Sequence, residues 1–378
     1  MDLDLYPALS SLTCFRPYAL CIVLQLIYKI RTNRSHIIMK ILGIEFAPLD
    51  VPFERRLQTF AVFQWTFSFL FLGFGCLFLF LYVLIATNYY YIPLLYALYY
   101  YFDSQRSERG GRRINWIRRW KIWTHFANYF PLEIVKTTEL DPNKNYIMGF
   151  HPHGVLSVSA FGNFTTEGTG WSKKFPGLTP YLMVLAGHFQ FPLYRDYFMA
   201  GGGVAVTASS MTHILTKNKS GQALGLVVGG ALEALEANPG QYNLKLKNKK
   251  GFIKIALKTG TSLVPVYSFG ETDLYLQADN KEGSFLRGIQ NFMTKKFGFS
   301  PPLFHGRGIF NYTFGLLPFR KPVHTVFGKP IDVPKTECPS QEQLDKLHKQ
   351  YMDALTLLFE EHKEKYGVPA DHHLNFID

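Results

Sequence analysis

Residues 146–154 read Tyr-Ile-Met-Gly-Phe-His-Pro-His-Gly, an apolar run that leads straight into two histidines. A short apolar run of this kind, bounded by glycine and proline, is typical of a buried strand. Polar residues that directly follow a buried strand are expected at the carboxyl edge of a parallel sheet. That edge is where α/β proteins bind their ligands.

From Arg106 onward, further short apolar runs alternate with segments of helical periodicity. The predicted strands are Tyr146–Phe150, Tyr181–Ala186, Val204–Val206, Leu224–Val228, Ser262–Tyr267 and Thr325–Phe327. The predicted helices are Ala208–Thr216, Gly251–Lys258 and Gln341–Tyr366. Ser340 and Gln343 have the spacing of a capping box at the start of the last helix. This alternation predicts an α/β body with a largely parallel sheet.

Residues 57–102 contain no Asp, Glu, Lys, Arg or His, which makes a charge-free run of 46 residues. One membrane-spanning helix needs about 20 apolar residues, so the run predicts a transmembrane helical hairpin. The expected spans are Thr59–Ala86 and Tyr89–Phe102. The second is rich in tyrosine, which also suits a helix that lies at the membrane interface or re-enters the membrane. The alternative is a buried helix pair in a soluble protein.

Basic residues flank the charge-free run on both sides, with Arg55 and Arg56 before it and Arg106 and Arg109 after it. Positive charge on both flanks predicts that both ends of the hairpin face the cytosol. The sequence therefore divides into an N-terminal cytosolic segment (residues 1–56), a membrane hairpin (57–102) and a catalytic domain (103–378).

The composition restricts the class of partner. The chain carries a net charge of +12, with 47% apolar and 18% charged residues. A basic surface favours anionic lipid or phosphate-bearing ligands. Nucleic acid is not expected, because no zinc-finger, RNA-binding or basic-region pattern occurs. The four cysteines are too scattered for a disulfide scaffold or a zinc site, and dinucleotide and Walker motifs are missing from the sequence. No metal and no cofactor is therefore expected.

His151 and His153 are the strongest candidates for catalysis. An imidazole with a pKa near ~6.5 is the usual general base at neutral pH. Pro152 between them fixes the direction of the chain, and Gly154 allows a sharp turn or a close approach to substrate. The alternatives are a pair of metal ligands, for which no third ligand lies at motif spacing, and a pair of structural histidines. Glu233 follows another strand and two glycines, where it could orient a histidine or simply begin a helix.

Two groups of basic residues are candidates for phosphate binding. Lys250, Gly251 and Lys254 lie at a predicted helix start, where cations and free N–H groups can bind phosphate. A solvated basic face is the alternative for this group. Arg307 lies between two glycines, which suggests an anion site lined by backbone.

Six blocks of the sequence occur in one order and together resemble the acyl-CoA acyltransferases of the diacylglycerol acyltransferase 2 family. The blocks are Tyr129-Phe130-Pro131, Phe150-His151-Pro152-His153-Gly154, Tyr194-Arg195-Asp196-Tyr197, Gly229-Gly230 with Glu233, Lys250-Gly251-Phe252 through Glu271, and His305-Gly306-Arg307-Gly308. The likeness runs from Ile44 to Asp378. The monoacylglycerol acyltransferase branch of this family is the one that three further segments resemble most, namely Ile44–Leu49, Arg55–Thr59 and Val368–Asp371.

The resemblance implies a multi-pass enzyme of the endoplasmic reticulum membrane, with lipid droplets as an alternative location. It would transfer a fatty acyl group from acyl-CoA, a co-substrate, to the hydroxyl of monoacylglycerol. The alternative acceptors are diacylglycerol and a long-chain alcohol, and a non-catalytic lipid-binding protein is the alternative of another class. Membrane lipid and the two substrates are the expected partners, and homo-oligomerisation is left open.

The resemblance also implies roles for individual site residues, but the sequence departs from the pattern of the wider family at one point. In the wider glycerolipid acyltransferases an aspartate follows the catalytic histidine by five positions, but here Leu156 and Val158 occupy those positions. The expected orienting acid is therefore Glu233, with His153 as general base and His151 as an oxyanion donor or a shaper of the loop. Arg195 resembles the substrate-binding arginine of the wider family.

Overall fold

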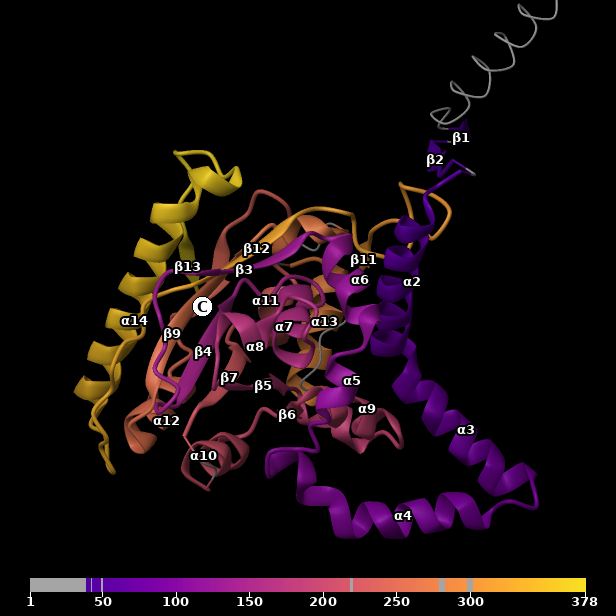
Figure 1. The fold of residues 1–378 in the computed structure, drawn as a ribbon, viewed down its shortest axis with the longest axis horizontal. Helices are drawn as coiled ribbons and strands as arrows, with labels where there is room; N and C mark the ends of the chain where they lie inside the picture. Colours follow the sequence, from indigo (N-terminus) through magenta and orange to yellow (C-terminus); the bar gives the residue numbers. More distant parts are fainter. Residues whose placement is uncertain (1–38, 42, 49, 218–219, 279–282, 298–301) are drawn as a thin grey trace, which may run out of the picture.

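A seven-stranded sheet lies at the centre of the body (Figure 1). The computed structural model describes residues 39–41, 43–48, 50–217, 220–278, 283–297 and 302–378, so most of the predicted N-terminal cytosolic segment lies outside the described residues. The strand order is β3-β12-β9-β4-β7-β5-β6. The strands are β3 (Leu132–Lys136), β4 (Tyr146–His151), β5 (Thr179–Val184), β6 (Gly203–Ala205), β7 (Gln222–Val227), β9 (Ser262–Phe269) and β12 (Val323–Phe327).

The predicted largely parallel sheet is confirmed. Every neighbouring pair of this sheet runs parallel except β9 and β12, which are antiparallel. All six predicted strands are present, with ends shifted by one or two residues. Strand β3 was not predicted. It is a short edge strand in which the exposed Glu133 alternates with buried residues, so it lacks the continuous apolar run of the inner strands.

Helices cover both faces of the sheet, and each face has its own core. The helices of the body are α5 (Asn115–Arg118), α6 (Lys121–Tyr129), α7 (Val158–Thr165), α8 (Trp171–Lys174), α9 (Tyr194–Gly201), α10 (Ala208–Lys217), α11 (Gly230–Ala234), α12 (Gly251–Thr259), α13 (Phe285–Phe297) and α14 (Gln341–His362). Successive residues of β4 point to opposite faces, so Met148 joins Phe126 and Trp171 in one cluster while Ile147 joins Tyr351 in the other.

The C-terminal helix confirms its predicted start. Ser340 accepts a hydrogen bond from the main-chain N–H of Gln343, and the Gln343 side chain accepts one from Ser340 in return. The regular helix ends at His362, four residues earlier than predicted, and Glu364–Tyr366 continue as a 3-10 turn. Short strand pairs join β1 (Met39–Ile41) to β2 (Ile44–Phe46), β10 (Leu276–Gln277) to β11 (Phe304–His305), and β13 (Asn375–Ile377) to β8 (Asn243–Lys245).

One helix of the described residues, Phe53–Ala86, is long and apolar enough to cross a membrane. It consists of α2 (Phe53–Phe67), a π-helical turn (Ser68–Leu72) and α3 (Gly73–Ala86). Helix α2 packs against the body, because Trp65 is buried and its ring centre lies 5.2 Å from those of Phe126 and Phe161. The expected first span therefore begins within the core of the body and only its second part projects (Figure 1).

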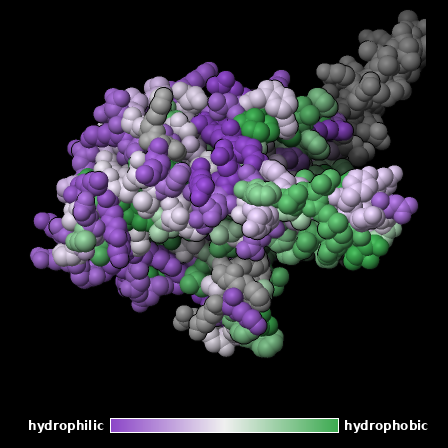
Figure 2. Space-filling model, turned by 90° about the horizontal axis from the view of Figure 1, so that it is seen from below, coloured by the Kyte–Doolittle hydropathy of each residue, from purple (hydrophilic) through white to green (hydrophobic). Residues whose placement is uncertain are grey.

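The second expected span forms helix α4 (Tyr91–Asp103), which has 13 residues and returns toward the body. This is shorter than the roughly 20 residues that a perpendicular span requires. α3 and α4 touch through the rings of Phe80 and Tyr96, whose centres lie 5.1 Å apart. Figure 2 shows hydrophobic residues gathered over this projecting segment, beside a mostly hydrophilic face of the body.

Candidate active site

Three loops meet at the carboxyl edge of the adjacent parallel strands β7, β4 and β9. The predicted histidine motif follows β4, Glu233 on α11 follows β7, and Glu271 follows β9 at the start of a 3-10 turn (Glu271–Leu274). β4 lies between the other two strands in parallel register. The sheet order therefore brings two carboxyl groups to the histidine loop from opposite sides.

His153 has a defined tautomer. Its Nδ1 lies 2.8 Å from the carbonyl oxygen of Gly154, and since a carbonyl only accepts, Nδ1 carries the proton and donates it. The Ser157 hydroxyl lies 3.2 Å from the same nitrogen and donates to the His153 carbonyl. Burial lowers the pKa of His153, so the ring is neutral at pH 7. Nε2 therefore has a free lone pair, and it has no hydrogen-bond partner among the described residues.

Glu233 is brought to His153, but it holds the main chain rather than the ring. One carboxylate oxygen accepts the main-chain N–H of His153 at 2.7 Å, and the other accepts that of Lys245 at 2.7 Å. The tautomer of His153, which the sequence assigned to Glu233, is set by the Gly154 carbonyl. Burial raises the pKa of Glu233 to about 7, against the lowering effect of the two N–H donors. A Cβ at Gly229 would come within 2.1 Å of this carboxylate, which explains the glycine.

Glu271 was not predicted as a site residue, although it occupies the equivalent place after β9. Its two oxygens accept the main-chain N–H groups of Val158 and Ser159 at 2.8 and 2.9 Å, at the start of α7. Burial raises its pKa to about 7. Gly154 has a φ of +62°, and a Cβ there would lie 2.7 Å from a Glu271 oxygen, so only glycine fits. The signal for Glu271 is a carboxylate directly after a buried strand.

His151 has a different environment from His153. It is fully buried, and its Nε2 lies 3.0 Å from the hydroxyl of Tyr351 on α14, which in turn donates to the carbonyl of Gly149 at 3.2 Å. Burial lowers the pKa of His151 to about 3. The ring therefore stays neutral and connects the motif to the C-terminal helix, which fits the predicted loop-shaping role better than contact with an oxyanion.

Two of the predicted basic residues, Lys250 and Arg195, form ion pairs with residues outside the histidine motif. Lys250 pairs with Asp345 at 2.7 Å and Lys254 is exposed, both at the start of α12. Arg195 is fully buried, donates to the Asp103 carboxylate at 2.9 Å and packs on the ring of Tyr100. It thereby joins α9 to the end of α4. Its assignment to substrate binding stays a prediction.

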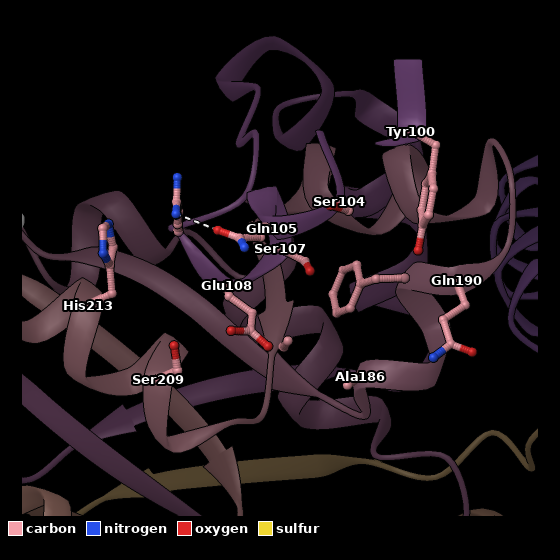
Figure 3. Close-up of a pocket in the computed structure, with 12 residues that line it drawn as sticks. Tyr100, Ser104, Gln105, Ser107, Glu108, Ala186, Gln190, Ser209 and His213 are labelled. Atoms are coloured by element: carbon pink, nitrogen blue, oxygen red, sulfur yellow. Dashed lines mark hydrogen bonds between the residues drawn. The ribbon is translucent and has the colours of Figure 1, made fainter. Parts of the chain in front are cut away.

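An open polar cavity of about 550 Å³ lies near the joint of α4 with the body (Figure 3). Its wall includes Gln105 and Glu108 from the turn after α4 and Ser209 and His213 from α10. Ala186, two residues after β5, and Ala205, the last residue of β6, also line it, so it lies at the same sheet edge as the histidine motif. None of the predicted site residues lines it.

Comparison with known proteins assigns the family. Residues 82–377, most of the chain, match the protein family described as diacylglycerol acyltransferase. The chain belongs to the diacylglycerol acyltransferase family. The resemblance inferred from the six sequence blocks is thereby confirmed, and the family is one of enzymes.

The chain is similar to curated relatives of two different names within the diacylglycerol acyltransferase family. The chain is 51% identical to 2-acylglycerol O-acyltransferase 1 of Bos taurus over 88% of its own length and 99% of the relative's. It is 47% identical to diacylglycerol O-acyltransferase 2 of Homo sapiens over 84% of its length and 81% of the relative's. A crystal structure of a 1-acyl-sn-glycerophosphate acyltransferase from Thermotoga maritima covers 79% of this chain and 94% of its own, at 12% identity and a TM-score of 0.37.

Replacing Glu233 by glutamine is expected to weaken both activity and stability of this acyltransferase. The amide offers only one acceptor oxygen, so either His153 or Lys245 would face an NH₂ group with its main-chain N–H unsatisfied. A buried N–H left without a partner costs about 1–3 kcal/mol. We expect Glu233→Gln to lower the melting temperature and to reduce turnover about tenfold or more. The exposed Glu361→Gln is the matched control, and wild-type values for Glu233→Gln would contradict this positioning role.

Proposed function

We propose that the protein is an acyl-CoA-dependent O-acyltransferase that esterifies monoacylglycerol to diacylglycerol, and further to triacylglycerol, with His153 as general base. Membership of the family and the 51% identity to a 2-acylglycerol O-acyltransferase support the reaction. The single structural observation that carries the mechanism is the neutral His153 ring, with its proton held on Nδ1 by the Gly154 carbonyl and Nε2 open.

In this mechanism Nε2 of His153 takes the proton of the acceptor hydroxyl while the oxygen attacks the thioester carbonyl. The C–O bond forms, the C–S bond breaks, and the imidazolium returns the proton to the CoA thiolate. Gly154 and Val155 are buried residues, and within the described ranges their main-chain N–H groups have no hydrogen-bond partner. Buried N–H groups are rarely left unpaired, so these two are the proposed donors to the oxyanion.

The proposed setting is the endoplasmic reticulum membrane, with both termini in the cytosol. Residues 57–102 lack charge, and arginines flank them on both sides. The part of the Phe53–Ala86 helix that follows α2, the π-helical turn together with α3, would cross the membrane. The 13-residue α4 would form the returning arm of the hairpin, lying along the interface or re-entering. Both lipid substrates dissolve in the bilayer, so this arrangement would keep the histidine motif close to them.

Relatives named for the two acceptors are similar to the chain, at 51% and 47% identity, so the acceptor is tested directly. The decisive experiment offers one labelled acyl-CoA together with monoacylglycerol, diacylglycerol or a long-chain alcohol to membranes that contain the protein. Ester formed fastest with monoacylglycerol supports the proposal. Faster ester formation with diacylglycerol or the alcohol would identify that compound as the acceptor instead of monoacylglycerol. Lipid binding without release of CoA would show that the protein is a lipid-binding protein and not an enzyme.

The pH dependence of kcat/KM provides a second test of the base. His153 must be deprotonated to act, and burial lowers its pKa below the ordinary 6.5. We therefore expect kcat/KM to fall at low pH with a midpoint below 6.5, as Nε2 takes up a proton, and to reach a plateau at higher pH. The rates are measured with saturating acylglycerol between pH 5 and pH 8. A midpoint near 7 would instead point to Glu233 or Glu271, whose pKa values are about 7.

A further inference from the structure

Buried arginines in the described part of the chain fall into two kinds. Three of them form ion pairs with carboxylates, in the pairs Arg118–Glu167, Arg195–Asp103 and Arg287–Glu236. Arg307 is also buried, with 7% of its surface exposed, but no carboxylate of the described residues pairs with it. A buried charge is normally paired, because removing it from water without a counter-charge is strongly unfavourable. The positive charge at Arg307 therefore calls for an anion.

Arg307 and Arg320 are held in place by uncharged groups. Nε of Arg307 donates to the Gly308 carbonyl at 3.1 Å, and its guanidinium lies 4.6 Å from the ring centre of Tyr312. The guanidinium of Arg320 lies 4.1 Å from the ring centre of Tyr129 and donates to the side chain of Gln58, while its buried Nε has no partner. Aromatic rings and amide groups hold both guanidinium groups in place but do not compensate their positive charges.

Arg55 adds a third positive charge near Arg307 and Arg320. Burial, together with the positive charges of Arg55 and Arg307, lowers the pKa of Arg320 to about 10. Burial raises the pKa of Tyr129, and the positive charges of Arg307 and Arg320 act in the opposite direction. Arg320 donates to Gln58, one helical turn after Arg55 on α2. It also packs on Tyr129, to which Arg307 is hydrogen-bonded. The three arginines are therefore neighbours, and we call Arg55, Arg307 and Arg320 the arginine cluster. An anion between them would relieve their mutual repulsion.

The arginine cluster extends from the start of α2 toward the loop that holds the histidine motif. Arg55 is in the first turn of α2, where that helix begins. On the other side, the main-chain N–H of Phe319, next to Arg320, donates to the carbonyl of Leu274 at 2.8 Å. Leu274 ends the 3-10 turn that begins with Glu271, the residue against Gly154. The cluster is therefore linked through Leu274 and Glu271 to the loop that carries His153.

We propose that the arginine cluster binds phosphate groups of acyl-CoA, an inference that rests on the proposed acyl-CoA-dependent function. Guanidinium groups match phosphate geometry with paired N–H donors, and pre-positioned groups lose little freedom on binding. The cluster is better suited to this than Lys250, whose ammonium group already pairs with Asp345. The pantetheine arm would then lead the thioester from the cluster to His153.

The test compares Arg320→Gln and the exposed Arg55→Gln with wild type, using the full chain in nanodiscs of neutral phosphatidylcholine. Charge-assisted hydrogen bonds of this strength correspond to about tenfold in affinity. We expect each substitution to raise the KM for palmitoyl-CoA and the Kd for free CoA about tenfold while kcat changes little, and the effect to shrink at high salt. S-palmitoyl-pantetheine, which has no phosphate, is expected to show no difference between variant and wild type.

Arg119→Gln, which removes an exposed arginine elsewhere on the body, is the matched control and is expected to behave as wild type. Unchanged CoA affinity in both test variants overturns the inference, whatever the turnover. So does a loss of binding to phosphatidylserine vesicles with CoA binding intact, which would assign the cluster to a lipid headgroup. Arginine-dependent CoA binding without any ester product supports the site while refuting the proposed reaction, so the two failures are distinguishable.

Discussion

His153→Ala is expected to lower the rate of ester formation by about 10²–10⁴-fold, the contribution of a positioned general base. The substitution removes the imidazole whose proton is held by the Gly154 carbonyl, and the nearby Ser157 hydroxyl, which donates to the His153 carbonyl, is too weak a base to replace it. The measurement is transfer of a labelled acyl group from acyl-CoA to monoacylglycerol in membranes, normalised to the amount of folded protein.

His373→Ala is the matched control, because His373 is an exposed histidine near the C-terminus and its contact with Glu360 is a surface interaction. The control is expected to retain wild-type activity. Near wild-type turnover in His153→Ala, at equal protein level, would remove His153 as the base. His151 would not be a ready substitute, because burial holds its pKa near 3 and its Nε2 is occupied by Tyr351.

The second large effect is expected at the joint between the projecting helices and the body. Asp103→Ala leaves the guanidinium of Arg195 buried without its carboxylate, and it also removes a partner of Arg112 at 2.7 Å. Removing one partner of a buried pair costs about 3–5 kcal/mol, and we expect the lower end because Arg195 keeps the main-chain oxygen of Asp103 and the Tyr100 ring. The apparent melting temperature in detergent should therefore fall by several degrees.

The exposed Asp353→Ala is the control for loss of an aspartate, and the double variant Asp103→Leu with Arg195→Met tests the pair itself. Replacing both charges with apolar groups should recover part of the lost stability, since no charge is then buried alone. A large rise in the KM for acyl-CoA with an unchanged melting temperature would contradict this structural role. That outcome would instead favour the sequence-based assignment of Arg195 to substrate binding.

Local pattern was sufficient for most elements of the fold. The inner strands are apolar on both faces, so runs such as Ser262–Tyr267 could be recognised without knowing their neighbours. The capping box at Ser340 is likewise a contact between residues three apart. Edge strand β3 escaped prediction because one of its sides is exposed. The part of α2 from Thr59 onward was predicted as a membrane span, although Trp65 is buried in the core.

The sequence by itself determined the α/β class, the long apolar helix, the histidine loop after a buried strand and the family. Only the tertiary structure decided which groups hold that loop. Glu271 and Val158 are 113 residues apart, and His151 and Tyr351 are 200 apart, yet each pair is in contact. Periodicity reports only whether each residue is buried and which way it points. Contacts over such separations depend on the order β9-β4-β7 and on the docking of α14, which are set by the packing of the whole sheet.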